Sequence, residues 1–146
     1  MLTVLRQQIV DEATTWIGTP FVHQGRLRGV GVDCAGLLIG VAHSLGLSDY
    51  DATGYGRAPH AGLADAAAER EMQRIEFDDV QPGDILKFRV EKHSQHFGIV
   101  SSMSAHGTPA VYFVHSFSKV GRVVETRLDQ FWRDRVTGAY RFAGVI

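Results

Sequence analysis

The order of its hydrophobic patterns constrains the fold of this chain more than any other feature. Over residues 5–17 and 34–45, apolar side chains recur at spacings of three and four, which is typical of amphipathic helices. From residue 85 to the end, runs rich in β-branched and aromatic residues are separated by Gly, Ser and Pro, which is typical of strands. Helices followed by strands indicate an α+β fold, so we expect N-terminal helices packed on a mainly antiparallel β-sheet.

Two helices are predicted near the N-terminus. The first ends at Gly18. The second begins after Asp33 and ends before Gly46, because aspartate is a favoured N-cap and glycine a favoured C-terminal stop. A third, short helix is expected over residues 62–75, a stretch rich in helix formers. The apolar face of the first helix consists of Leu5, Ile9, Ala13, Trp16 and Ile17.

The segment between these two helices is predicted to be a loop. Residues 18–32 hold four of the sixteen glycines of the chain and one proline. Such a backbone adopts unusual torsions or approaches another group closely, so we expect this loop to border a site.

The strands are predicted in the second half of the chain. Residues 81–84 form a turn, and residues 85–90 alternate apolar and polar side chains as a half-buried strand does. Further strands are predicted over residues 96–102, 110–117, 121–127 and 138–146, with a short helix over residues 128–134.

Length and composition exclude several classes of protein. With 146 residues, 45% hydrophobic and 21% charged, the chain has the size and composition of one globular domain, residues 1–146. No apolar run is long enough to span a membrane, and the first sixteen residues lack the continuous apolar core of a signal peptide. Fifteen Lys and Arg against sixteen Asp and Glu give a charge of -1, so no basic excess indicates direct nucleic-acid binding.

The single cysteine, Cys34, excludes a disulfide within the chain. Together with the seven histidines it leaves three interpretations open: an inert buried thiol, a nucleophile served by a histidine, or a metal site with mixed His and Cys ligands. A cysteine in the first turn of a helix meets the positive end of the helix dipole, which favours the thiolate. The position of Cys34 therefore favours the nucleophile.

Two histidines are suitably placed to serve such a nucleophile. His96 begins the apolar strand HFGIV, and His115 lies in the next predicted strand, VYFVHSF. Neighbouring antiparallel strands set two side chains side by side, so His115 is suited to orient the imidazole of His96. His93 is a rival base, but the strand period of two places it on the opposite face from His96.

Each of these residues also has a non-catalytic interpretation. Cys34 on its own fits a buried inert thiol, His96 a surface imidazole at a strand end, and His115 a histidine at the edge of the core that bonds to backbone. Taken together, the helix-start and strand positions favour the catalytic interpretation.

Four motifs in this order resemble those of the NlpC family of papain-like cysteine peptidases, which cut bacterial cell-wall peptides. They are GTPFVHQGRLRGVGVDCAGL, QPGDIL, HFGIV and VHSF. The resemblance extends from the first helix to the C-terminus and implies a papain-like fold. GTPFVHQG with GVGVDCAGL, and the tail HSFSKVGRVVETRLDQFWRDRVTGAYRFAGVI, further resemble a subgroup encoded among the tail genes of phages and gene transfer agents.

This resemblance implies a role for each residue that matches a family motif. Cys34 would be the nucleophile, His96 the general base and acid, and His115 the residue that orients His96. Asp33 would help to bind the free amine of a stem peptide, and His23 would line the cleft.

Two positions depart from the family pattern. Phe21, in the substrate-binding loop, stands where the family usually has a tyrosine, and Ala35 stands where a serine commonly follows the cysteine. Both changes remove a hydroxyl group from the expected pocket.

The resemblance also implies a biological setting. The protein would hydrolyse amide bonds of peptidoglycan stem peptides, typically between γ-linked D-glutamate and the diamino acid that follows, without a cofactor. It would be made in the bacterial cytoplasm, join other tail-tip or hub proteins, and open the cell wall of a target cell during DNA delivery. Two alternatives remain: a catalytically weak or inactive structural tail-tip component, and a zinc site formed by Cys34, His96 and His115.

Overall fold

The computed structural model of the chain describes residues 3–51, 70–91, 95–105 and 108–146. Its helices are α1 (Arg6–Thr15), α2 (Cys34–Ser44), the 3-10 helix η1 (Phe77–Asp79) and α4 (Gln130–Arg133). Its strands are β1 (Arg26–Leu27), β2 (Gly31–Val32), β3 (Met72–Ile75), β4 (Ile85–Arg89), β5 (Gln95–Ala105), β6 (Thr108–Phe117), β7 (Arg122–Arg127) and β8 (Val136–Phe142).

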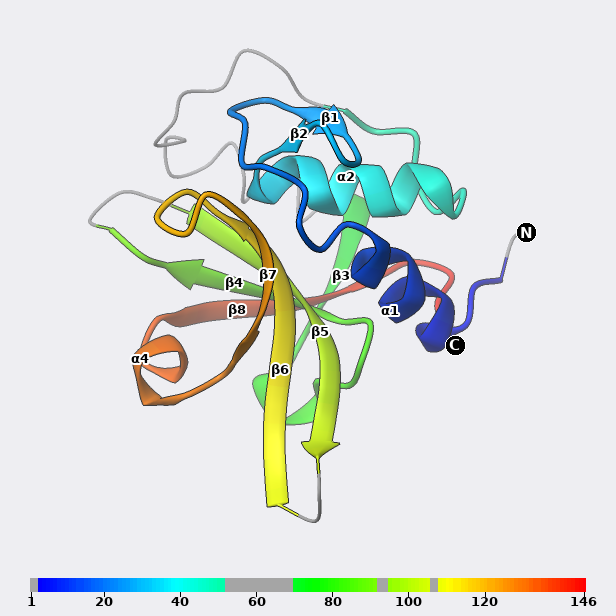
Figure 1. Cartoon of the computed structure of the whole chain (residues 1–146). Helices are drawn as coiled ribbons and strands as arrows, with labels where there is room; N and C mark the ends of the chain where they lie inside the picture. Colours follow the sequence, from blue (N-terminus) through cyan, green and yellow to red (C-terminus); the bar gives the residue numbers. More distant parts are fainter. Residues whose placement is uncertain (1–2, 52–69, 92–94, 106–107) are drawn as a thin grey trace.

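One antiparallel sheet organises the fold, and helices lie on both of its faces (Figure 1). Its six strands follow the order β3-β8-β4-β5-β6-β7, and every neighbouring pair is antiparallel. β1 and β2 form a separate small hairpin beside the start of α2. The predicted α+β fold is therefore confirmed.

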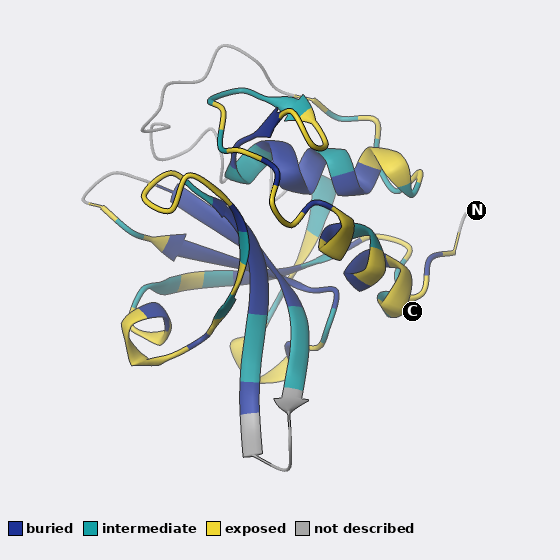
Figure 2. Cartoon of the chain, in the orientation of Figure 1, coloured by how far each residue is buried: buried dark blue, intermediate teal, exposed yellow. Residues whose placement is uncertain are grey.

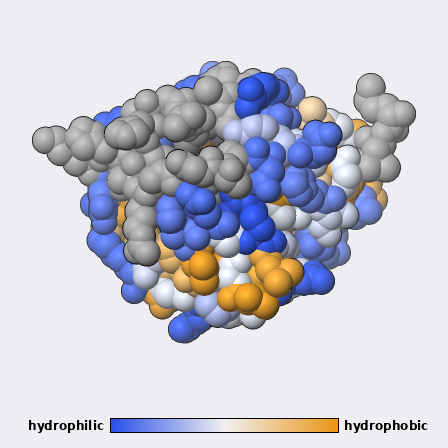
Figure 3. All heavy atoms as spheres, turned by 90° about the horizontal axis from the view of Figure 1, so that it is seen from above, coloured by the Kyte–Doolittle hydropathy of each residue, from blue (hydrophilic) through white to orange (hydrophobic). Residues whose placement is uncertain are grey.

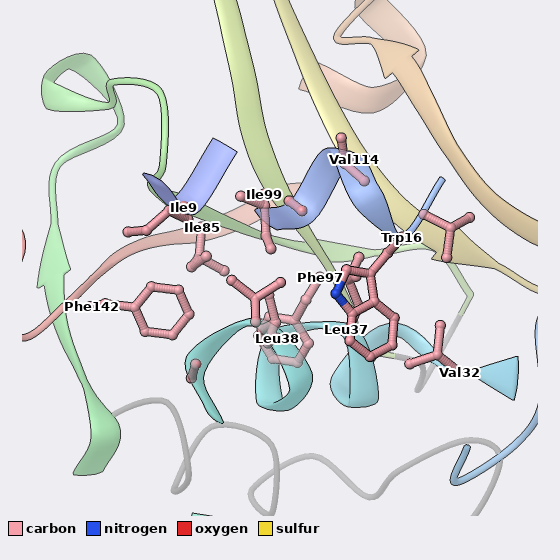
Figure 4. Close-up of a cluster of buried hydrophobic side chains, with 14 of the residues drawn as sticks. Ile9, Trp16, Val32, Leu37, Leu38, Ile85, Phe97, Ile99, Val114 and Phe142 are labelled. Carbon is pink, nitrogen blue, oxygen red and sulfur yellow. The ribbon is translucent and has the colours of Figure 1, made fainter. Parts of the chain in front are cut away.

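Two hydrophobic clusters cover the two faces of the sheet. The first contains residues of α1 and α2 packed on the sheet (Figure 4), and the second lies under α4. Buried residues accordingly follow the middle of the sheet and the inner sides of the helices (Figure 2). The first cluster includes Ile9, Trp16, Leu37, Leu38, Ile85, Phe97, Ile99, Val114 and Phe142, and the second includes Leu86, Phe88, Val100, Phe113, Leu128, Trp132 and Ala139.

Two local predictions differ from the structure. The prediction of a helix over residues 62–75 is wrong for Met72–Ile75, which form β3 and pair with β8, while residues 62–69 lie outside the described part. The half-buried alternation predicted for residues 85–90 is also wrong. Ile85 to Phe88 are buried without interruption, because clusters of hydrophobic side chains cover both faces of β4.

The outer surface of the described chain is mainly hydrophilic in the view of Figure 3, with apolar side chains gathered in a smaller area. Leu27 and Val30, which border the turn between β1 and β2, are 61% and 64% exposed. None of the helices in the described ranges is both long and apolar enough to cross a lipid bilayer.

A buried carboxylate connects three distant parts of the chain. Asp84, in the turn before β4, is fully buried and accepts hydrogen bonds from Arg6 of α1 at 2.9 Å and from Arg141 of β8 at 3.0 and 2.9 Å. It also accepts a bond from the backbone N–H of Gln81, which closes the predicted turn. The carboxylate thus holds α1 and β8 at one corner of the sheet.

Replacing Asp84 by Asn retains the shape of the side chain but removes the charge between two arginines. We expect the free energy of unfolding to fall by about 3 kcal/mol, because removing one partner of a buried ion pair costs about 3–5 kcal/mol. Urea denaturation measures this loss, with Asp78→Asn on the exposed surface of η1 as the matched control. Equal losses in the two variants would contradict the importance of the Asp84 contacts.

Candidate active site

The start of α2 is defined by its N-cap and by a glycine. Asp33 has extended backbone torsions and its Oδ1 accepts a hydrogen bond from the N–H of Gly36 at 2.8 Å, so the helix begins at Cys34 as predicted. A Cβ atom at Gly36 would collide with the carbonyl oxygen of Gly25. Only glycine therefore allows the first turn of α2 to lie this close to the preceding loop.

The loop before α2 folds around the buried carboxylate of Asp33. Oδ2 accepts a hydrogen bond from the N–H of Gln24 at 2.8 Å, and Oδ1 lies 3.3 Å from Nη1 of Arg26. His23 approaches Oδ2 with its Nδ1 at 3.9 Å. Gln24 has a φ of 61°, a left-handed torsion uncommon outside glycine, and its bond to Asp33 holds it there. The structure thus brings His23 and Asp33 together, one residue from Cys34.

Phe21 lies on the other side of this loop. It is partly buried, its N–H donates to the carbonyl oxygen of Gly121 at 2.8 Å, and it forms a bridge with Val32. Phe21 therefore contacts the residue two positions before Cys34, so the predicted loop borders the start of α2. Ala35, the second position that lacks a hydroxyl, follows Cys34 directly in α2.

The thiol of Cys34 rests against the backbone of β5. Its Sγ donates to the carbonyl oxygen of Gln95 at 3.9 Å, and the N–H of Phe97 donates to the sulfur. Both groups belong to neighbours of His96 in the chain. Although both residues are described, no hydrogen bond joins the sulfur of Cys34 to the imidazole of His96.

The position of this thiol reflects a divergence of two strands. β5 and β6 are paired from Ile99 and Val114 toward their connecting turn, and residues 95–98 of β5 have no partner on the described part of β6. Ser116 of β6 instead donates to the carbonyl oxygen of Val32 at 2.7 Å. The segment that leads into α2 therefore contacts both strands where they separate.

His96 and His115 lie together on the sheet face that α4 covers. His96 Nε2 is 2.7 Å from His115 Nδ1, and His115 Nε2 is 2.8 Å from Thr126 Oγ1. The predicted side-by-side arrangement on neighbouring strands is confirmed. His96 is 6% exposed and His115 is fully buried, which excludes a surface imidazole at position 96. His115 bonds to the side chains of His96 and Thr126, so it is not a core-edge histidine that bonds to backbone.

Aromatic side chains enclose the histidine pair. The ring of Trp132 in α4 lies 5.8 Å from that of His96 and 5.1 Å from that of His115. Phe117 lies 5.3 and 5.5 Å from the same two rings. Water is therefore largely kept from the bond between the two imidazoles.

Burial keeps all three proposed catalytic groups neutral. Burial lowers the pKa of His96 well below its ordinary value, with a smaller contribution from His115, and lowers the pKa of His115 to about 3. Burial and then the nearby Asp33 charge raise the pKa of the Cys34 thiol to about 12, against smaller opposing effects of backbone N–H groups. The expected preference for a thiolate is thus wrong, because burial outweighs the helix start.

Sequence reasoning missed three residues of this site. Thr126 and Trp132 reach the histidines only through the pairing of β7 with β6 and the position of α4. Gln95 is the third, and its buried Oε1 has no hydrogen-bond partner. For Thr126 the sequence offered one signal: the alternation of side chains along a strand places residues 124 and 126 on the same face.

His93, the rival base, lies outside the described residues.

The geometry does not favour the metal alternative. Both ring nitrogens of His115 are engaged, one with His96 and one with Thr126. Within the residues that the structure describes, no three His, Cys, Asp or Glu side chains form a group able to hold a metal ion.

Comparison with solved structures shows the fold. Similar structures include a lipoprotein-like NLP/P60 family protein from Staphylococcus aureus (TM-score 0.63, 23% identity, 94% of this chain and 41% of that one). The NlpC/p60 domain of the peptidoglycan hydrolase SagA has a TM-score of 0.64 at 22% identity, over 95% of this chain and all of that one. An NlpC/P60 family protein from Bacillus cereus has a TM-score of 0.68 at 20% identity, over 97% of this chain and 41% of that one.

The chain spans about two fifths of the length of the S. aureus and B. cereus proteins. It shares with these structures the α+β fold of NlpC/P60 proteins. No curated protein matches the sequence. A family model described as a domain of unknown function, DUF1287, matches residues 63–142, a range that includes His96 and His115 and begins after Cys34. Because this match covers more than half of the 146 residues, the chain belongs to the DUF1287 family.

Proposed function

We propose that this protein is a cysteine peptidase that hydrolyses amide bonds in peptidoglycan stem peptides. One observation carries the proposal. The only thiol of the chain sits at the first residue of α2, and its sulfur contacts the carbonyl oxygen of Gln95, the residue before a buried histidine that is itself bonded to a second histidine. The likeness of the fold to the SagA domain, a peptidoglycan hydrolase, supports the same reaction class.

In this proposal His96 activates the thiol during the attack. The neutral thiol has a high pKa, so it requires a base as its sulfur approaches the carbonyl carbon of the substrate. His96 Nε2 is engaged by His115, which leaves Nδ1 to take the proton. The backbone N–H of Cys34 stabilises the oxyanion, and the protonated His96 then donates to the leaving amine. Water finally hydrolyses the thioester and restores the thiol.

The loop around Asp33 is the proposed binding site for the stem peptide. The free amine of the peptide would approach the Asp33 carboxylate near His23, which is partly exposed. Phe21 beside Val32 supplies an apolar wall instead of a hydroxyl group. The bond that we expect to be cut lies between γ-linked D-glutamate and the diamino acid that follows.

The resemblance of residues 18–37 and 115–146 to tail proteins supports a more specific setting. We propose that the protein is part of the tail tip of a phage or gene transfer agent, beside other tip or hub proteins. It would be assembled in the bacterial cytoplasm and would act on the periplasmic cell wall of a target cell.

A structural tail-tip component without catalysis is the second candidate. Two observations favour it: the raised pKa of the Cys34 thiol, and the missing hydrogen bond between Cys34 and His96. In this candidate the NlpC/P60 fold serves assembly, and the partly buried thiol has no chemical role.

Cys34→Ala is expected to abolish the release of peptide fragments from purified peptidoglycan, because no other thiol can form the thioester. Mass spectrometry of the soluble fragments measures the loss and identifies the bond. Ser44→Ala, at the exposed far end of α2, is the matched control and should release fragments as the unmodified protein does. Undiminished release by Cys34→Ala would refute the peptidase, and no release by the unmodified protein would favour the structural candidate.

Alkylation by iodoacetamide tests the protonation state of Cys34. A raised pKa means that the folded protein keeps the thiol proton over the pH range in which an unfolded cysteine, with a pKa of about 8.5, loses it. At about pH 8.5 we therefore expect the folded protein to react on the order of a hundredfold more slowly than the same protein in urea. The folded rate should keep rising as the pH approaches 12. A plateau reached below about pH 8 would instead show a resting thiolate.

A further inference from the structure

We propose that Thr126 is a positioning residue that determines which ring nitrogen of His96 carries the proton. The inference rests on the proposed peptidase function and concerns the same site. Its basis is a continuous line of short contacts, from His96 Nε2 to His115 Nδ1 at 2.7 Å and from His115 Nε2 to Thr126 Oγ1 at 2.8 Å.

The line of contacts has two possible directions. A neutral imidazole has one N–H donor and one acceptor nitrogen, so the protonation of one ring decides that of the next. In the forward direction His96 Nε2–H donates to His115, and His115 Nε2–H donates to the hydroxyl oxygen of Thr126. In the reverse direction the Thr126 hydroxyl donates to His115, and His115 Nδ1–H donates to His96.

Only the forward direction leaves His96 able to act as a base. Its Nδ1 is then unprotonated and can take the thiol proton, while Nε2–H remains bonded to His115. In the reverse direction Nδ1 already carries a proton, and the only free lone pair of His96 is occupied by His115. The direction of the line therefore decides whether Cys34 can be activated.

The fold gives Thr126 a fixed position for this role. β6 and β7 pair His115 with Val124, so Thr126 lies two residues further along β7 on the same face. As a β-branched residue, threonine has a restricted side-chain torsion. Trp132 and Phe117 pack against the ring of His115 and limit the access of water. In the forward direction the hydroxyl accepts the N–H of His115, which without it would be a buried donor lacking a partner and therefore costly. In the reverse direction only a lone pair of His115 depends on the hydroxyl, and an unpaired acceptor is tolerated better than an unpaired N–H, so loss of the hydroxyl disfavours the forward direction.

Thr126→Val tests the proposal because valine has nearly the shape of threonine but no hydroxyl. We expect kcat to fall by roughly tenfold or more, with little change in KM. The loss should not exceed the roughly 10²–10⁴-fold that general acid–base catalysis contributes in total. Thr126→Ser should restore most of kcat, because serine retains the acceptor. Thr137→Val, an exposed position of β8 away from the histidines, is the matched control.

A second measurement reads the proton positions without any substrate. Long-range ¹H–¹⁵N NMR of the imidazole rings should show Nε2–H forms of His96 and His115 in the unmodified protein and in Thr126→Ser. In Thr126→Val both rings should shift toward the Nδ1–H form. Unchanged ring tautomers in Thr126→Val, or a shift without any loss of kcat, would overturn the positioning role.

The two readouts separate this inference from the proposed function. If the protein releases no peptides from peptidoglycan, the peptidase proposal fails, and the NMR comparison still decides whether Thr126 controls the histidine tautomers. If peptides are released but the tautomers do not respond to Thr126→Val, only the further inference fails.

Discussion

The contact between the start of α2 and the diverging ends of β5 and β6 is the interaction on which the rest of the site depends. Ser116 holds the carbonyl of Val32, and the backbone of β5 holds the sulfur of Cys34. Glycine at position 36 lets the preceding loop lie against the first turn of α2, because a Cβ there would collide with the carbonyl oxygen of Gly25. Close approach of backbone segments therefore sets the shape of this contact and the position of the thiol.

Burial gives the site its chemical character. It moves the pKa of the thiol upward and the pKa values of both histidines downward, so every group is neutral at rest. In the proposed mechanism such a neutral pair exchanges its proton only as the substrate is attacked, and the direction of the bonds from His96 through His115 to Thr126 then matters more than any resting charge. Trp132 packs against both imidazole rings and contributes to the burial that keeps them neutral.

The sequence predicted the elements whose causes are local. Asp33 caps α2 as expected, and the strands that carry His96 and His115 lie where their patterns indicate. Predictions failed where distant contacts decide. Met72–Ile75 has a composition that favours a helix, but pairing with β8 makes it a strand. The thiol pKa depends on how deeply the helix start is packed, and the roles of Thr126 and Trp132 depend on the register of β7 and the position of α4.

The place of β8 in the sheet has a consequence for the order in which the protein can fold. This last strand of the described chain lies between β3 and β4, so the sheet stays in two parts until residues 136–142 have been synthesised. α1, α2 and Cys34 are synthesised before every strand of the six-stranded sheet, yet the two parts of that sheet join only when β8 is present. Closing the sheet therefore requires pairing between strands that lie far apart in the sequence, which slows folding.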